Sequence, residues 1–185
     1  MYKRQKLTTI PASIGKLKNL TKLELAGNNL NKIPECIGEL NNLTRLDLSN
    51  NLLTDFPEFI GELTNLTWLI LNENSLSNFP KSIGKLTNLD RLELNDNFFV
   101  NVPESVGNLT NLTVLILTNN QITELSEAVG NLTNLSLLYL FGNQLSKLPK
   151  SIANLTNLEL LSLRGNHIKN LPSELSHLCH ITKFD

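Results

Sequence analysis

The feature that most constrains this chain is a leucine-rich pattern that returns every 23 residues. Each copy reads L-x-x-L-x-L-x-x-N-x-[LIF]-x-x-[ILFV]-P and continues as x-x-[IV]-G-x-L-x-N, with departures in single copies. The leucines that open the full copies are Leu20, Leu43, Leu66, Leu89, Leu112, Leu135 and Leu158. A unit of this size cannot bury its own apolar side, so consecutive copies must stack and share one continuous core.

The first half of each unit predicts a short strand followed by a turn. Its L-x-L segment alternates apolar and polar residues, which is the pattern of a strand buried on one side only. Stacked units therefore place their strands side by side in a parallel sheet. The asparagine follows the strand, and its amide offers a donor and an acceptor to backbone groups that would otherwise be buried without partners.

The second half of each unit predicts a short helical or 3-10 turn. A proline ends the extended segment in every unit except one, where Ser126 takes its place, and a glycine usually follows within the turn. Helical segments pack about 8–10 Å apart, whereas strands pack about 4.8 Å apart. The helical side must be the longer one, so we expect the stack to curve with the sheet on its inner side.

On these motifs the chain resembles the leucine-rich-repeat proteins, from about Leu7 to Asp185. The LPxxIGxLxxL half resembles the 23-residue subtype of bacterial repeat proteins and of the intracellular Ras-group family. The resemblance implies an α/β fold, a right-handed horseshoe solenoid with a parallel sheet on its concave face and short helical or 3-10 turns on its convex face. We expect one solenoid over residues 1–185, with a partial repeat at 7–19, full repeats beginning at 20, 43, 66, 89, 112, 135 and 158, and a truncated repeat at 181–185.

Residues at the third, fifth and seventh positions of each unit should face outward from the sheet. In the N-terminal half they form charged pairs, Lys22 with Glu24, Arg45 with Asp47, and Arg91 with Glu93. The two signs alternate, so this half presents no single-sign field that would attract a polyanion. We interpret it as a solvated surface, because exposed pairs of this kind contribute little free energy.

The C-terminal half of the same face is apolar, and it is the candidate binding site. Large exposed apolar patches mark interaction surfaces, and tyrosine and tryptophan dominate the binding energy of interfaces. The candidate partner-binding residues are Trp68, Ile70, Val114, Ile116, Leu137, Tyr139, Phe141 and Leu160, with Arg164 placed to pair with an acid at the rim. Two alternatives remain open: the patch is covered by another segment or a second copy, or it is drift of the repeat without a partner.

Two further clusters have simpler explanations. Phe98 and Val100 should project from the loop edge beside the sheet, and we interpret them as local drift. His167, His177, Cys179 and His180 gather in the last unit, where framework residues have diverged. Histidine and cysteine are zinc ligands, but this explanation by divergence leads us to expect no metal. Neither a phosphate-binding loop nor a nucleophile triad is present, so we expect no catalysis and no cofactor.

Composition limits the environment of the chain. The formal net charge of −1 argues against nucleic acid as the main partner, and no apolar run is long enough to insert in a bilayer. We see no secretory signal, which slightly favours the cytoplasm and leaves open the export of a longer parent protein. The two cysteines, Cys36 and Cys179, lie six units apart, roughly 30 Å at strand spacing and beyond disulfide reach.

These observations predict a non-catalytic scaffold that binds a protein or peptide on its concave face. Two other functions remain open. The chain is the recognition arm of a larger enzyme, such as a ligase or kinase, or it is a structural array that self-associates through the apolar patch or its open ends. No capping motif stands at either end, so we expect a fragment of a longer repeat protein.

Overall fold

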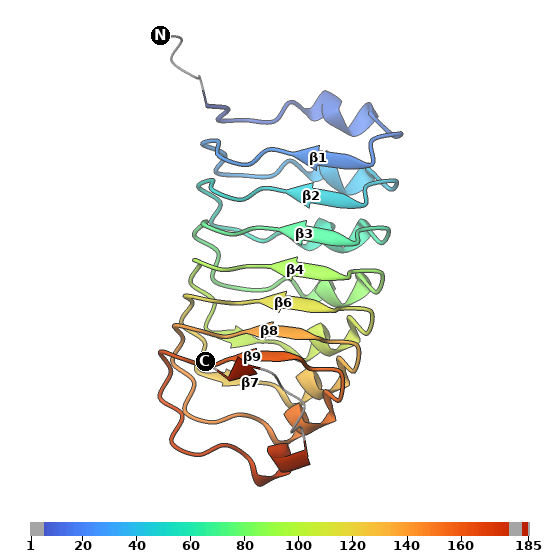
Figure 1. Ribbon diagram of the computed structural model, residues 1–185. Helices are drawn as coiled ribbons and strands as arrows, with labels where there is room; N and C mark the ends of the chain where they lie inside the picture. Colours follow the sequence, from blue (N-terminus) through green and yellow to red (C-terminus); the bar gives the residue numbers. More distant parts are fainter. Residues whose placement is uncertain (1–5, 178–182, 185) are drawn as a thin grey trace.

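The structure, a computed structural model, describes residues 6–177 and 183–184 and is a stack of similar units (Figure 1). Each full unit contributes one short strand to a single parallel sheet, and each strand pairs with the next in a register of 23 residues. The strands are β1 (Lys22–Glu24), β2 (Arg45–Asp47), β3 (Trp68–Ile70), β4 (Arg91–Glu93), β6 (Val114–Ile116), β8 (Leu137–Tyr139), β9 (Leu160–Ser162) and β10 (Lys183–Phe184). The predicted sheet and its order are therefore confirmed.

A five-residue 3-10 helix follows each extended segment. The helices are η1 (Ala12–Lys16), η2 (Glu35–Glu39), η3 (Glu58–Glu62), η4 (Lys81–Lys85), η5 (Glu104–Asn108), η6 (Glu127–Asn131), η7 (Lys150–Asn154) and η8 (Ser173–His177). A proline with extended backbone precedes η1 to η5 and η7, because its fixed φ ends the strand-like segment. Ser126 precedes η6 instead, and its hydroxyl accepts a hydrogen bond from the Ala128 N–H at 3.1 Å.

The helices and the sheet form two layers on opposite sides of the core. Figure 1 shows the strands closer together than the helical segments behind them, most clearly toward the C-terminal end, so the stack curves with the sheet on the inner side. Neighbouring helices also approach closely. A Cβ atom on Gly130 of η6 would lie 2.5 Å from the Ser151 carbonyl oxygen of η7, so only glycine permits this spacing.

The core lies between the two layers and consists of the repeated aliphatic positions. In the unit that begins at Leu66, the side chains of Leu66, Leu69 and Leu71 are fully buried, and the equivalent leucines of the neighbouring units repeat this arrangement. Phe99 is the largest fully buried side chain. Its ring centroid lies 4.5 Å from that of Phe79, in a tilted contact that adds to the burial of apolar area.

Asparagine side chains connect each unit to the one before it. Asn97 Nδ2 donates to the carbonyl oxygens of Leu71 and Leu94, at 3.0 and 3.2 Å, and Oδ1 accepts from the Leu76 N–H at 3.0 Å. The same contacts recur at Asn51, Asn74, Asn120, Asn143 and Asn166. The predicted role of this ladder, to satisfy buried backbone groups, is confirmed.

One element was not predicted from the sequence. Strands β5 (Asn101–Val102) and β7 (Glu124–Leu125) pair in parallel as a second, two-stranded sheet just before the proline position. The side chains of Val102 and Leu125 fill core positions there, and the Thr123 N–H donates to the Val100 carbonyl at 3.1 Å. The stacking of units thus brings a second extended segment into register beside the main sheet.

Candidate partner-binding surface

We call the outward surface of the eight-stranded sheet the sheet face. Because paired strands keep a register of 23 residues, the third and fifth positions of the units align into columns across it. The two halves of this surface differ in chemistry. Charged residues occupy β1, β2 and β4, whereas apolar residues occupy β6 and β8 and begin β9.

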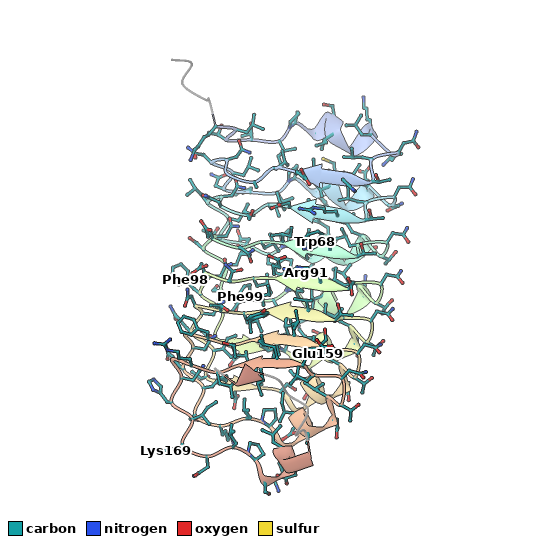
Figure 2. The ribbon with its side chains drawn as sticks, in the orientation of Figure 1. Trp68, Arg91, Phe98, Phe99, Glu159 and Lys169 are labelled. Carbon is teal, nitrogen blue, oxygen red and sulfur yellow. The ribbon has the colours of Figure 1, made fainter. Side chains whose placement is uncertain are left out.

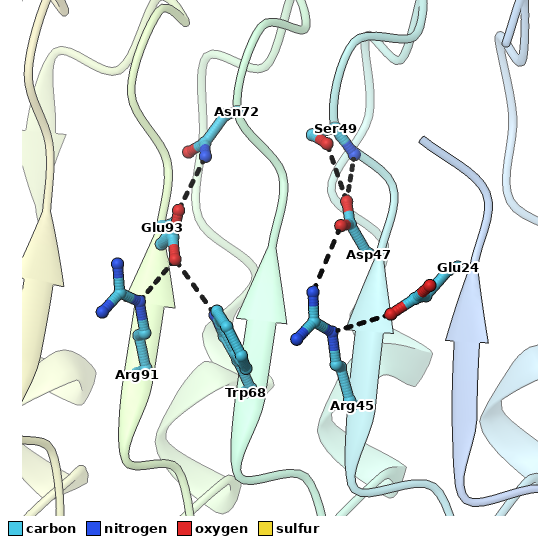
Figure 3. Close-up of polar contacts among 8 residues, drawn as sticks. All are labelled: Glu24, Arg45, Asp47, Ser49, Trp68, Asn72, Arg91 and Glu93. Atoms are coloured by element: carbon cyan, nitrogen blue, oxygen red, sulfur yellow. Dashed lines mark hydrogen bonds and ion pairs between the residues drawn. The ribbon is translucent and has the colours of Figure 1, made fainter. Parts of the chain in front are cut away.

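Trp68 lies at the centre of the charged half, between two arginines (Figure 3). The Arg45 guanidinium carbon Cζ lies 3.8 Å from the tryptophan ring centroid, and that of Arg91 lies 5.3 Å from it. Such cation–π contacts are favourable because the negative face of the ring attracts the cation. Trp68 Nε1 also donates to Glu93 Oε1 at 3.0 Å, so the ring and its N–H group already have partners within the chain.

Glu93 joins this cluster from β4. Its carboxylate accepts hydrogen bonds from Arg91 Nε, from Trp68 Nε1 and, at 2.9 Å, from Asn72 Nδ2. Burial by itself would raise the pKa of Glu93, but the hydrogen bonds from Arg91, Asn72 and Trp68 and the charge of Arg91 outweigh it and hold the pKa below its ordinary value. The carboxylate is therefore a fixed acceptor that orients both Trp68 and Arg91.

Arg45 connects β2 to β1. Its Nε lies 3.3 Å from Glu24 Oε1 and its Nη2 lies 3.8 Å from Asp47 Oδ2, while Asp47 Oδ1 accepts from the Ser49 hydroxyl at 2.7 Å. The predicted pair of Arg45 with Asp47 is present. The predicted pair of Lys22 with Glu24 is not, because Glu24 turns to the arginine of the next strand.

The exposure of Ile70 and Val114 differs from the sequence prediction. Both lie on the sheet face outside the core cluster, yet they are only 6% and 8% exposed. Each is flanked at close strand spacing by two column neighbours, which are Asp47 and Glu93 for Ile70 and the larger Arg91 and Leu137 for Val114. Together with the engaged ring of Trp68, their burial leaves a narrower exposed surface than the sequence predicts.

The hydrogen bonds of Glu93 give a pH prediction. Because the pKa of Glu93 is lower in the folded chain than in the unfolded chain, its carboxylate stabilises the fold at neutral pH, and this contribution is lost as the pH falls through the lowered value. We expect Glu93→Gln to lower the free energy of unfolding by about 1 kcal/mol at pH 7. In urea titrations, the difference between wild type and variant should shrink as the pH is lowered below the ordinary glutamate pKa of about 4.3.

The control for this measurement is Glu104→Gln. Glu104 is exposed and makes no hydrogen bond or ion pair with any other residue in 6–177, so its replacement should leave stability almost unchanged at both pH values. Glu58 also has a lowered pKa, through hydrogen bonds from the backbone N–H groups of Lys81 and Ser82, so it adds its own pH dependence to the stability of wild type. The effect of Glu93 is therefore the difference between wild type and variant at each pH. A stability difference between wild type and Glu93→Gln that stays constant as the pH is lowered would contradict the prediction.

The apolar half of the sheet face is exposed in part. We call Ile116, Leu137, Tyr139, Phe141 and Leu160 the apolar strip. All lie on β6, β8 and β9 or directly after β8, on neighbouring strands of one sheet. Phe141 is 37% exposed and the other four are half-buried. The Tyr139 hydroxyl makes no hydrogen bond with any residue in the described part of the chain, which leaves it available to a partner.

Arg164 lies beside Phe141, at the seventh position of the next unit. The Gly142 N–H donates to the Arg164 carbonyl at 2.9 Å, which joins the two backbones, and a Cβ atom on Gly165 would lie 3.8 Å from Phe141 Cε2. The Arg164 side chain is exposed and makes no ion pair or hydrogen bond with any other residue in 6–177. The structure thus places an unpaired cation at the edge of the apolar strip.

Phe98 and Val100 project from the loop edge and not from the sheet face. They are 49% and 40% exposed, and Figure 2 shows Phe98 at the margin of the molecule while Phe99 points inward. The predicted direction of both side chains is confirmed. Their neighbours in the same columns are polar (Ser75, Gln121, Ser77 and Thr123), so the exposed apolar area there is confined to one unit.

The described residues contain no group of three or more potential metal ligands, and none of their helices is long and apolar enough to cross a membrane. His167 is exposed and Cys36 is a free thiol. The side chain of His177, together with Cys179 and His180, lies outside the described residues, as does any relation between the two cysteines.

Sequence reasoning missed the Arg45–Trp68–Arg91 stack, although the signal is present. The three residues occupy one column at 23-residue spacing, and adjacent strands lie about 4.8 Å apart. If residues 23 positions apart are compared, and not only the residues within each strand, a guanidinium is expected on each side of the tryptophan ring. The hydrogen bond from Asn72 to Glu93 has no comparable signal, because it runs diagonally between columns.

Comparisons with known proteins agree with this geometry. A family model described as a leucine-rich repeat region matches residues 2–97, and two models described as leucine rich repeat match residues 87–145 and 157–178. The comparison with curated proteins gives no match.

Solved structures of similar fold come from bacteria and plants. A leucine-rich-repeat protein of Leptospira interrogans is 33% identical, with a TM-score of 0.79, over 97% of this chain and 52% of its own. The ectodomain of the membrane receptor kinase GASSHO1/SCHENGEN3 of Arabidopsis thaliana, in complex with CASPARIAN STRIP INTEGRITY FACTOR 2, is 36% identical, with a TM-score of 0.84, over 93% of this chain and 22% of its own. The plant peptide hormone receptor RGFR1 in complex with RGF2 is 34% identical, with a TM-score of 0.84, over 95% and 29%.

The present chain spans about half, or less, of the length of these solved proteins. The first family model alone matches more than half of the chain, and the strand register and asparagine ladder repeat throughout the described units. The chain belongs to the leucine-rich-repeat family.

Proposed function

We propose that this chain is a non-catalytic scaffold that binds a protein or peptide through the apolar strip on its sheet face. The observation that carries the proposal is the contiguity of the strip, since four partly exposed apolar residues lie on the neighbouring strands β6, β8 and β9, and Phe141 follows β8 closely. Monomeric soluble proteins seldom leave such a surface without a partner. Tyr139 and Phe141 anchor the contact, and Ile116, Leu137 and Leu160 extend it.

The rest of the sheet face has a supporting role in this proposal. Ile70 and Val114 face outward but are only 6% and 8% exposed, so they widen the contact little. Trp68 is held by Arg45, Arg91 and Glu93, and a partner would meet its edge within a charged cluster. Two of the similar solved structures are described as complexes with a peptide hormone or a named factor, which supports a protein or peptide as the class of partner.

The proposal is tested by replacing both Tyr139 and Phe141 with alanine. We expect the double variant to lose at least about 2 kcal/mol of binding free energy, roughly thirtyfold in Kd, because aromatic anchors at the centre of an interface dominate its affinity. Binding is measured with proteins captured from an extract of the native source by wild type and then titrated individually against wild type and variant.

The matched control is the double variant Phe98→Ala/Val100→Ala, which removes a similar exposed apolar pair from the loop edge. It should bind like wild type. Circular dichroism must show that both variants melt at the temperature of wild type. If the Tyr139/Phe141 variant unfolds instead, its side chains belong to the core and the proposed surface is wrong.

Two other functions are separated by direct measurements. One similar solved protein is the ectodomain of a receptor kinase, which favours, as a second candidate, a recognition arm attached to an enzyme. The reading frame on either side of these 185 residues decides that question. Self-association through the apolar strip predicts a sedimentation coefficient that rises with concentration, and a monomer at all concentrations would contradict it.

A further inference from the structure

We propose that the partner segment carries an aspartate or glutamate side chain within two residues of the apolar side chain that covers Phe141, and that Arg164 pairs with this carboxylate. The inference rests on the proposed function and names the chemistry of its partner. Phe141 and Arg164 lie at the same position of neighbouring units, joined by the hydrogen bond from the Gly142 N–H to the Arg164 carbonyl at 2.9 Å.

The charge of Arg164 is not balanced by any of the described residues. The outward positions of the three units that carry the apolar strip contain no acidic residue, and Arg164 makes no ion pair within residues 6–177. Among the described residues, the nearest outward carboxylate along the sheet is that of Glu93, which lies three strands away, roughly 14 Å at strand spacing, and already accepts three hydrogen bonds. The other arginines of the sheet face each have an acidic partner.

A partner that covers Phe141 must also exclude water from Arg164. Phe141 leans toward Gly165, since a Cβ atom on Gly165 would lie 3.8 Å from its Cε2, so a side chain packed on this ring also approaches the adjoining arginine. Removing water from a guanidinium without supplying a counter-charge is unfavourable, whereas a carboxylate matches its donors with two hydrogen bonds. A neutral apolar segment therefore binds less favourably at this position than a segment with a carboxylate.

The geometry also favours a residue inside a chain over a free terminal carboxylate. The sheet continues beyond Arg164, because the backbone of β10 pairs with β9 at Lys183 and Leu160, so a segment crossing Arg164 has sheet on both sides. An extended peptide rises about 3.3 Å per residue, and neighbouring strands lie about 4.8 Å apart. One or two residues therefore separate the apolar side chain on Phe141 from the carboxylate on Arg164.

The test uses random peptides displayed between fixed flanking sequences, so that no peptide offers a free carboxyl terminus. They are selected on the wild-type chain and then counter-selected against Tyr139→Ala/Phe141→Ala. We expect the surviving peptides to carry Asp or Glu within two residues of a large apolar residue. Replacing this Glu by Gln, or this Asp by Asn, in the synthetic, end-capped peptide should weaken binding to wild type about tenfold and binding to Arg164→Gln less than about twofold.

Lys32→Gln is the matched control, because it removes the same charge from an exposed loop position six units away from Arg164. This control variant should bind the acidic peptide and its Gln or Asn version as wild type does. The variant Arg164→Glu should instead select peptides with Lys or Arg at the acidic position. Four outcomes overturn the inference. Peptides that depend on Tyr139 and Phe141 but carry no acid refute it and leave the proposed function intact.

Equal losses in Arg164→Gln and Lys32→Gln also refute the inference. So does a neutral peptide with a free carboxyl terminus that binds as tightly as the acidic one. If no selected peptide depends on Tyr139 and Phe141, the proposed function fails together with the inference. Melting temperatures equal to that of wild type establish that each variant is folded.

Discussion

Replacing Phe99 with alanine should lower the free energy of unfolding by about 3–5 kcal/mol. Phe99 occupies a position filled by leucine or isoleucine in the other units and is fully buried, with its ring 4.5 Å from that of Phe79. Alanine would lose the transfer free energy of the ring and leave a cavity between two units. Because neighbouring units hold one another in register, they cannot move together to fill this cavity.

The neighbouring Phe98 provides a control that differs in burial and not in chemistry. It is 49% exposed, so Phe98→Ala should change stability by about 0.5 kcal/mol or less. Both variants are measured by urea titration followed by circular dichroism, with the slope compared to that of wild type. Similar losses at the two positions would mean that the loop edge is packed and that the inward direction of Phe99 is wrong.

The regular part of this fold could be predicted from the sequence because stacking leaves few choices. Once Leu66 and Leu89 are aligned at a spacing of 23, the alternation in each strand determines which side chains are buried. The structure agrees, with Leu69 and Leu92 in register and both fully buried. The asparagine ladder followed from the same alignment, because a buried turn needs a donor and an acceptor at one place.

The irregular features could not be predicted from one unit, since they depend on contacts between units. Ile70 and Val114 face outward as the alternation requires, yet neighbours in their columns cover them. Strands β5 and β7 pair only because two adjacent units extend in the same way before the proline position. Periodicity determines which way a side chain points, whereas its exposure depends on the size of the residues 23 positions away.

The two halves of the sheet face arrange their outward side chains differently at the same close strand spacing. In the charged half, Arg45 and Arg91 enclose Trp68, and Glu93 fixes the geometry, so most polar groups are satisfied within the chain. In the apolar half no such cluster forms, and Phe141 and Arg164 remain exposed beside each other. The first half is thus preorganised and self-sufficient, and we infer that recognition concentrates in the second.

Replacing Asn97 with alanine should lower the free energy of unfolding by about 3 kcal/mol. The side chain is 4% exposed, and its loss leaves the Leu76 N–H and the Leu71 and Leu94 carbonyls without this partner. The two carbonyls keep donors from Asn74 and Asn120, whereas the buried Leu76 N–H is left unsatisfied, which costs about 1–3 kcal/mol in addition to the two lost hydrogen bonds. Asn97→Asp should be harmful too, because it removes the donors and buries a charge.

The position of these bonds makes a second readout possible. Asn97 lies in one unit, while Leu71 and Leu76 lie in the unit before it, so the variant weakens a single junction of the stack. Amide hydrogen exchange should accelerate at Leu76 but not at Leu53, whose N–H donates to Asn74 in the junction before. Asn101→Ala is the control, since Asn101 is exposed and its side chain makes no hydrogen bond within residues 6–177. Equal exchange rates at Leu76 in Asn97→Ala and wild type would show that the ladder does not hold these units together.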